Sequence, residues 1–136
     1  MATVTYEKQI TALLVIDPYN DFISEGGKDP VPSSSRSQAR SSQRSIGVPA
    51  ALPTRIWICS SRSTAYQLIV IGLIAHTCIE ATVRFAAELG YEVTVVKDAT
   101  ADYSDEMMHA ALDINMPNYA SAIVTTKEVI SSISSL

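Results

Sequence analysis

The sequence predicts an α/β fold in which a doubly wound parallel sheet of about four or five strands is flanked by helices. Two observations lead to this prediction. The chain contains short apolar runs with the length of buried strands, and from residue 68 onward such runs alternate with segments of helical periodicity. Parallel strands that are covered on both faces read as near-continuous apolar runs. With 136 residues the chain can bury one core, so residues 1–136 are expected to form a single domain.

The individual elements follow in chain order. Residues 11–16, TALLVI, are predicted to form a buried strand that closes on Asp17. Residues 55–60, RIWICS, are strand-like and are expected to pair into the sheet. The remaining strands are predicted at 68–73, 91–96 and 121–126, and the helices at 78–89, 104–115 and 127–133.

The middle of the chain has a different composition from both ends. Residues 33–45 contain seven serines and three arginines, with no aliphatic side chain larger than alanine. Such a segment cannot contribute a core face, so residues 31–50 are predicted to be a disordered Ser/Arg-rich insert. Between Pro30 and Ile79 there are five arginines but no aspartate, glutamate or lysine. A misread exon or a shifted reading frame would produce this composition.

Composition also excludes several classes of function. The formal charge of -4 gives no reason to expect a nucleic acid or an anionic membrane as partner. No run approaches the ~20 apolar residues of a membrane span, and the N-terminus lacks signal-peptide features, so a cytoplasmic protein is expected. Two cysteines and two histidines occur in no recognisable ligand spacing, which predicts no metal site and no cofactor.

The residues after the 68–73 strand carry the strongest chemical signal. Thr77 and Glu80 form a T-x-x-E pattern ahead of a helical periodicity, which predicts a capping box with Cys78 as the first helical residue. A thiol at a helix N-terminus is expected to have a lowered pKa. The alternative is that Cys78 merely fills space as a small hydrophobic residue. Its place beyond the carboxyl end of a parallel strand, where ligands bind in such sheets, favours a nucleophile.

Asp17 is the candidate partner of this cysteine. It closes the first strand at the same edge of the sheet, and if the two strands are adjacent its carboxylate can take the thiol proton. The alternative is that Asp17, which precedes Pro18, caps a turn. Asp21 fits that role better, because it lies in the loop PYND. Cys59 lies within an apolar run and is interpreted as structural.

Two stretches resemble the isochorismatase-like cysteine hydrolases, a family that includes isochorismatases and nicotinamidases. They are LLVIDPYNDFISEGG at 13–27 and IVIGLIAHTCIEATVRFAAELGYEVTVVKDATADYS at 69–104, and the resemblance as a whole covers residues 10–28 and 68–130. It implies that Asp17 is the catalytic aspartate and Cys78 the nucleophile. It further implies a cis peptide between Ile74 and Ala75, and an oxyanion hole made by the amides of Ala75 and Cys78.

The resemblance also implies a small-molecule amide or related compound as substrate, and a homo-oligomer, since members commonly form dimers or larger assemblies. The family's catalytic lysine, on a strand between the two motifs, has no plausible equivalent here. Lys28 is the only lysine in the interval, and it follows the EGG loop instead of ending a strand. The loss of its positive charge predicts impaired turnover.

Two alternatives to a hydrolase remain open from the sequence. One is a non-catalytic remnant that keeps the fold without the chemistry. The other is an interaction module in which the Arg/Ser tract binds RNA or a kinase-regulated partner. The interaction module is the weaker alternative, because three arginines with no interleaved aromatic residue offer few contacts to nucleic acid.

Overall fold

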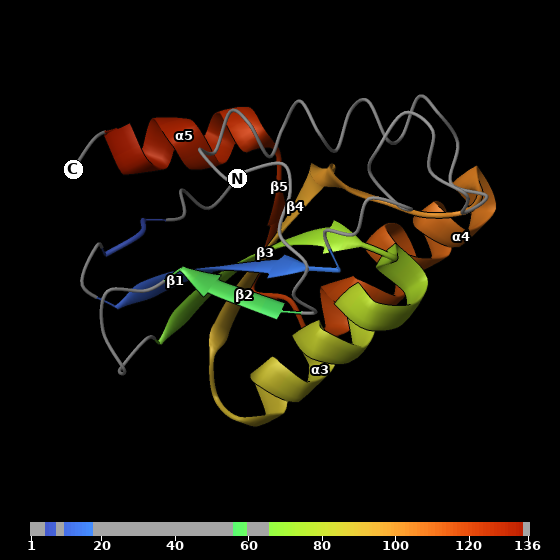
Figure 1. Cartoon of the computed structure of the whole chain (residues 1–136), viewed down its shortest axis with the longest axis horizontal. Helices are drawn as coiled ribbons and strands as arrows, with labels where there is room; N and C mark the ends of the chain where they lie inside the picture. Colours follow the sequence, from blue (N-terminus) through green and yellow to red (C-terminus); the bar gives the residue numbers. More distant parts are fainter. Residues whose placement is uncertain (1–4, 8–9, 18–55, 60–65, 135–136) are drawn as a thin grey trace.

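A five-stranded sheet forms the centre of the molecule (Figure 1). The computed structural model describes residues 5–7, 10–17, 56–59 and 66–134. The strands lie in the order β2-β1-β3-β4-β5, and β1, β3, β4 and β5 are parallel to one another. Their bounds are Thr11–Ile16 for β1, Ile56–Cys59 for β2, Gln67–Leu73 for β3, Glu92–Ala101 for β4 and Ala122–Val124 for β5.

Helices cover both faces of the sheet, which gives the predicted α/β arrangement (Figure 1). On one face lie a π-helical turn η1, the helix α3 that continues from it, and α4 with the π-turn η2 and the short 3-10 turn η3. On the other face lies α5. Their bounds are Ala75–Ile79 for η1, Glu80–Glu88 for α3, Asp105–His109 for α4, Ala110–Asn115 for η2, Met116–Asn118 for η3 and Thr126–Ser134 for α5.

The two faces of the sheet carry separate hydrophobic cores. Side chains alternate between faces along a strand, so Leu14 and Val70 pack toward α3 whereas Val15 and Ile71 pack toward α5. The helices complete the cores with Val83 of α3 on one side and Val129 of α5 on the other. Because β3 is central and buried along nearly its whole length, its Val/Ile-rich run has the composition of a strand covered on both faces.

Most predicted elements are confirmed, with three differences. The strand at 55–60 does pair into the sheet, but β2 runs antiparallel to β1, so the sheet is mixed instead of wholly parallel. β4 extends to Ala101 instead of ending at 96, because its second half resumes pairing with β3 after a bulge between Val70 and Gly72. The segment predicted as one helix at 104–115 is α4 followed by η2. The proposed insert at 31–50, Lys28 and Asp21 lie outside the described residues.

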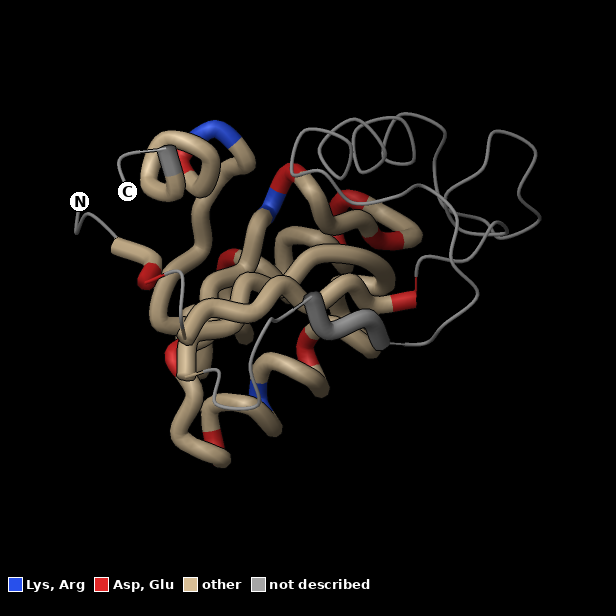
Figure 2. Tube along the Cα trace, turned by 60° about the vertical axis from the view of Figure 1, so that its left-hand side comes forward, with Lys and Arg blue, Asp and Glu red and all other residues tan. Residues whose placement is uncertain are grey.

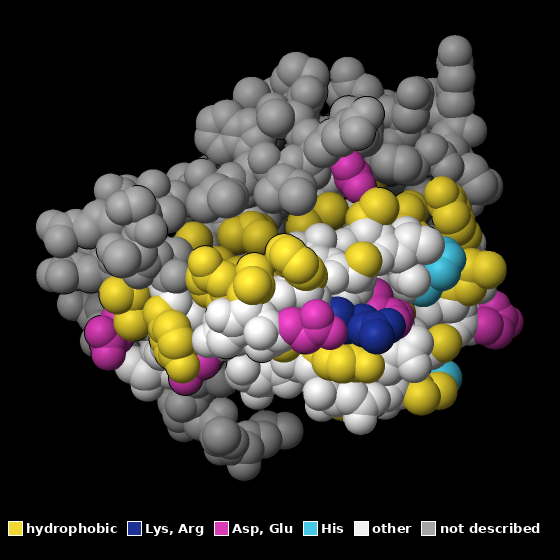
Figure 3. Space-filling model, turned by 90° about the horizontal axis from the view of Figure 1, so that it is seen from below, with side chains coloured by type: hydrophobic (Ala, Val, Ile, Leu, Met, Phe, Trp, Pro, Cys, Tyr) yellow, Lys and Arg dark blue, Asp and Glu magenta, His cyan; other side chains and the backbone are white. Residues whose placement is uncertain are grey.

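Part of the helical layer remains apolar on its outer side. Phe85 and Leu89 of α3 are 64% and 60% exposed, and Figure 3 shows hydrophobic side chains gathered on this face of the molecule. Within the described ranges, no helix has the length and apolar character that a membrane crossing requires.

Candidate active site

The site forms where the strand order reverses, at the carboxyl ends of β1 and β3. These two strands are parallel neighbours, and Ile16 of β1 pairs with Gly72 of β3. The chains approach so closely there that a Cβ on Gly72 would lie 2.1 Å from the carbonyl oxygen of Ile16, and Gly72 has a φ of +126°. Only glycine fits this position without displacing β1. The close approach brings Asp17, which follows β1, beside the turn that follows β3.

Asp17 itself has an unusual backbone conformation. Its φ is +47°, in the left-handed region that few residues other than glycine adopt. Aspartate is among the residues that tolerate this region best, but the conformation still costs about 1–3 kcal/mol. Such strain is typical of functional sites. Here it accompanies a partly buried carboxylate held at the edge of the sheet, next to Cys78.

The turn that carries Cys78 begins earlier than the sequence predicts. Helical residues start at Ala75, and the amide of Ile79 donates to the carbonyl of Ile74 at 3.1 Å, which is the i to i−5 bond of a π-helix. Thr77 therefore lies inside the turn and is not the N-cap. The predicted capping box is wrong, because Glu80 accepts a hydrogen bond from Asn115 Nδ2 at 3.1 Å and no reciprocal bond with Thr77 forms.

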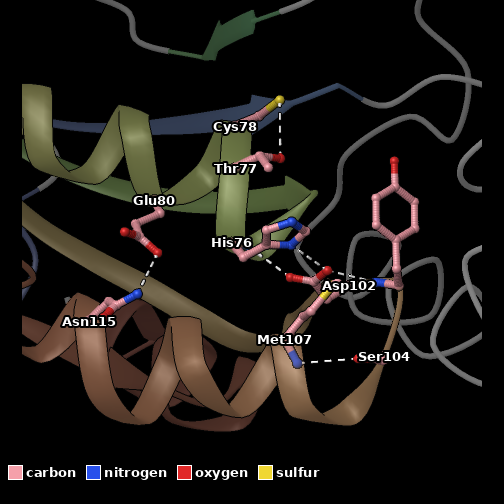
Figure 4. Close-up of polar contacts among 9 residues, drawn as sticks. His76, Thr77, Cys78, Glu80, Asp102, Ser104, Met107 and Asn115 are labelled. Carbon is pink, nitrogen blue, oxygen red and sulfur yellow. Dashed lines mark hydrogen bonds and ion pairs between the residues drawn. The ribbon is translucent and has the colours of Figure 1, made fainter.

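Asp102, at the end of β4, takes the place of the missing cap (Figure 4). Its Oδ2 accepts a hydrogen bond from the backbone amide of His76 at 2.8 Å. Its Oδ1 lies 2.6 Å from His76 Nδ1 and accepts a further bond from the amide of Tyr103 at 2.7 Å. The Asp102 side chain is fully buried, while that of His76 is 29% exposed. The rings of His76 and Tyr103 meet edge to face, with centroids 6.0 Å apart.

Cys78 is exposed, and Asp17 is the side chain that raises its pKa most. The pKa of the Cys78 thiol is raised above its usual value, first by desolvation of the sulfur and then by its hydrogen bond with Asp17, whose negative charge adds to the effect. The Thr77 hydroxyl, 3.8 Å from Sγ, and the backbone of Ile74 act in the opposite direction. The expectation of a lowered pKa is therefore wrong, because the helix terminus is outweighed by burial and a neighbouring carboxylate.

The structure also corrects the position of the cis peptide bond. It lies between Leu73 and Ile74, and not between Ile74 and Ala75. β3 ends at Leu73, as the sequence predicts. The backbone group that contacts the Cys78 sulfur is accordingly that of Ile74, and Ala75 is buried in the core with Ile79.

The described part of the chain is poor in positive charge (Figure 2). Its basic residues are Arg84, Lys97 and Lys127, and none of them is among the groups that shift the pKa of Cys78. Arg84 stacks over the ring of Tyr119, at 4.9 Å from the centroid. No group of three or more potential metal ligands occurs within the described ranges.

A family model for the isochorismatase domain matches residues 51–128, which is more than half of the chain. The chain belongs to the isochorismatase family. Among curated proteins, an uncharacterized isochorismatase family protein of Bacillus subtilis, YddQ, is 54% identical over 35 residues. That match covers 26% of this chain and 19% of YddQ, so the shared sequence is a small part of that relative's length.

Solved structures confirm the isochorismatase-like fold over nearly the whole chain. An isochorismatase-like hydrolase from Alkaliphilus metalliredigens has a TM-score of 0.74 at 15% identity, covering 93% of this chain and 99% of that one. The MAR1 ribonuclease of Caenorhabditis elegans has a TM-score of 0.70 at 17% identity, covering 98% and 85%. The YcaC gene product of Escherichia coli, described as an octameric hydrolase of unknown specificity, has a TM-score of 0.67 at 17% identity, covering 97% and 83%.

Sequence reasoning placed Asp17 and Cys78 at one edge of the sheet, and the structure of this isochorismatase family member places them after neighbouring parallel strands, where Asp17 raises the pKa of the Cys78 thiol. It missed Asp102 and His76. A signal for His76 was present, since it is a polar residue two positions before the cysteine, in the segment that follows β3. No sequence signal pointed to Asp102, because its hydrogen bond with the His76 amide joins residues 26 positions apart and leaves no local pattern.

Proposed function

We propose that this chain is a hydrolase in which Cys78 is the nucleophile and Asp17 its general base. The observation that carries the proposal is the pairing of Ile16 with Gly72, which places Asp17, directly after β1, beside the turn of Cys78 at the switch point of the sheet, where Asp17 raises the pKa of the thiol. A raised thiol pKa means that sulfur is protonated at neutral pH, so nucleophilic attack needs a base in contact with it. Asp17 is the carboxylate in that place.

In the proposed reaction, Cys78 Sγ attacks the carbonyl carbon of an amide and its proton passes to Asp17. The C–N bond then breaks, and Asp17 returns the proton to the departing amine, which leaves a thioester on Cys78. Water, deprotonated by Asp17, attacks the thioester carbon. The C–S bond breaks, the carboxylic acid is released and the sulfur regains its proton.

The amides of Ile74 and Cys78 are the proposed oxyanion donors. Ile74 replaces Ala75 in this role, because the backbone of Ile74 contacts the sulfur that attacks the substrate. Both residues belong to the turn that Asp102 holds, so the donors and the nucleophile are fixed together. An oxyanion donor of this kind typically contributes about 3–4 kcal/mol to the stabilisation of the transition state.

The proposed substrate is a small molecule with an amide or similarly reactive acyl carbon, and no cofactor or metal takes part. The described surface carries more acidic than basic residues, which supports a small-molecule substrate over nucleic acid (Figure 2). Assembly into a homo-oligomer is part of the proposal. Because no lysine or arginine in the described part of the chain is among the groups that shift the Cys78 pKa, the second half-reaction is expected to be slow.

The test is a burst assay with the activated ester p-nitrophenyl acetate, in a Cys59→Ser background so that Cys78 is the sole thiol. We expect about one equivalent of p-nitrophenolate per folded chain, followed by slow turnover, with one acetyl group found on Cys78 by mass spectrometry. Cys78→Ala should abolish the burst. Asp17→Asn should slow acylation by about 100-fold, the lower range for loss of a general base.

Asp17→Asn has a second, opposite effect that separates base catalysis from simple damage. Without the carboxylate the pKa of Cys78 falls toward its usual value, so alkylation by iodoacetamide at neutral pH becomes faster while acylation becomes slower. A burst that survives Cys78→Ala would show that another group is the nucleophile. No burst from a chain whose circular dichroism shows it folded would favour the non-catalytic remnant.

A further inference from the structure

We infer, building on the function proposed above, that Asp102 is a positioning residue for Cys78: its carboxylate, directly after β4, caps the nucleophile turn and keeps the cysteine on the side of the turn that faces the end of β1 and Asp17. Ile74, at the N-cap position of this turn, makes no capping bond with its own side chain. The cap is supplied by a residue at the end of β4, one strand away in the sheet.

The contacts of Asp102 are those of a rigid support. Both carboxylate oxygens are used, with Oδ2 accepting from the His76 amide at 2.8 Å and Oδ1 lying 2.6 Å from His76 Nδ1. The amide of Tyr103 donates to the same Oδ1 and holds the carboxylate in place from its own backbone. The side chain is fully buried, so water does not compete for these bonds.

This support reaches Cys78 through the backbone of a single turn. His76 and Cys78 both lie within Ala75–Ile79, and the turn closes on itself through the carbonyl of Ile74, which accepts from Thr77 at 3.3 Å and from Ile79 at 3.1 Å. Figure 4 shows His76 directed toward Asp102 and Cys78 directed away from it. Asp102 therefore touches neither the sulfur nor Asp17, and acts by holding the turn between them.

β4 also supplies a matched control. Asp98 accepts from the amide and the hydroxyl of Thr126 at 2.7 and 2.9 Å, so it supports the start of α5 as Asp102 supports the start of η1. α5 lies on the opposite face of the sheet from Cys78 (Figure 1). Loss of either carboxylate should lower stability, but only loss of Asp102 should change the environment of the cysteine.

The experiment measures the pH profile of Cys78 alkylation by iodoacetamide in the Cys59→Ser background. In the parent chain the profile should have its midpoint above that of an ordinary cysteine, because the contact with Asp17 raises the thiol pKa. In Asp102→Asn the turn loosens and Sγ moves away from Asp17, so the midpoint should fall and alkylation near pH 8 should accelerate by about threefold or more. Asp98→Asn should leave the profile unchanged.

A double-mutant comparison identifies the route of the effect. In an Asp17→Asn background the carboxylate that raises the thiol pKa is already gone, so adding Asp102→Asn should produce no further shift. Where Asp102→Asn does not fold, His76→Ala is measured in its place: it removes the contact between the imidazole and Oδ1 but keeps the hydrogen bond from the backbone amide of residue 76, so a smaller shift in the same direction is expected.

An unchanged alkylation profile in folded Asp102→Asn or His76→Ala, with only the unfolding midpoint lowered, would overturn the positioning role. An equal shift in Asp98→Asn would do the same. Because alkylation requires no catalysis, these outcomes are independent of the burst assay. A parent chain that is never acylated but shows the Asp102 shift would refute the proposed hydrolase and leave Asp102 as the support of the turn.

Discussion

The chain contains the same T-x-x-E pattern at two helix starts, and the two behave differently. At the start of α5, Thr125 and Glu128 form a capping box: the Thr125 amide donates to Glu128 Oε2 at 2.7 Å, and the Glu128 amide donates to Thr125 Oγ1 at 3.4 Å. At the nucleophile turn, Thr77 and Glu80 do not form this pair. There the helix starts three residues earlier than the pattern predicts, at Ala75, and the Asp102 carboxylate accepts from the His76 amide.

The difference shows that a local capping pattern decides a helix start only when no distant group intervenes. Asp98 lies in β4 and Asp102 directly follows it, but Asp98 bonds to Thr126 inside the existing box, whereas Asp102 bonds to His76, one residue ahead of the candidate box. The first reinforces the local signal. The second moves the helix start, and with it the cysteine, from the first helical position to the middle of a π-turn.

The largest expected effect is at the close contact between β1 and β3, which positions the nucleophile turn but not α5. Gly72→Ala places a methyl group 2.1 Å from the Ile16 carbonyl oxygen at a φ of +126°, so we expect unfolding free energy to fall by about 3 kcal/mol or more. Urea denaturation measures it. Gly90→Ala is the control, because its φ of +88° is strained but its Cβ has open space, and it should cost only about 1 kcal/mol. Equal losses would mean that backbone strain, and not the contact with Ile16, accounts for the loss of stability in Gly72→Ala.

A smaller effect tests the two helix starts directly. Thr125→Ala removes the capping oxygen of α5 and should lower the unfolding free energy by about 1 kcal/mol. Thr77→Ala removes an exposed hydroxyl that caps nothing and should change it by less than about 0.5 kcal/mol. Urea denaturation of both variants measures the two changes in unfolding free energy. A larger loss for Thr77→Ala would show that Thr77 does cap the nucleophile turn.

The sequence was sufficient for the parts of the fold that depend on burial. β1 and β3 were predicted nearly to the residue because their apolar runs reflect packing on both faces. The juxtaposition of Asp17 and Cys78 followed from the parallel order of those strands. The start of the nucleophile turn and the pKa of Cys78 were predicted wrongly, since each depends on a carboxylate brought in by the fold, Asp102 in one case and Asp17 in the other.

The α5 capping box also predicts a pH dependence. The hydrogen bonds from the Thr125 amide and hydroxyl lower the pKa of Glu128 below its usual value. A carboxyl whose pKa is lower in the folded state contributes stability above its unfolded pKa and loses it as the pH falls through the folded pKa. Glu128→Gln should therefore flatten the acid side of the stability curve, measured by thermal melts in buffers of decreasing pH.

The smallest effect is expected beneath α5, in the cluster that contains Val129. The Tyr6 side chain packs there at 3% exposure, and its buried hydroxyl has no hydrogen-bond partner among the described residues. Tyr6→Phe removes a desolvated polar group without leaving a cavity, so the unfolding free energy should stay within about 0.5 kcal/mol or rise slightly. A loss of about 1 kcal/mol or more in the urea midpoint would instead assign that hydroxyl a bond in the folded chain.

The direction in which the Cys78 thiol points depends on the number of residues in the π-turn Ala75–Ile79 as well as on their identity. A π-turn contains one residue more than an α-turn, and each residue advances a helix by about 100°. Deleting one residue from this segment would let α3 keep Val83 and Ala86 in the core as an ordinary helix, but a different side chain would then face Asp17. Relatives should therefore be compared in this turn by counting residues from the end of β3. An alignment that is shifted by one position in the turn assigns the wrong backbone amide and the wrong side chain to the site.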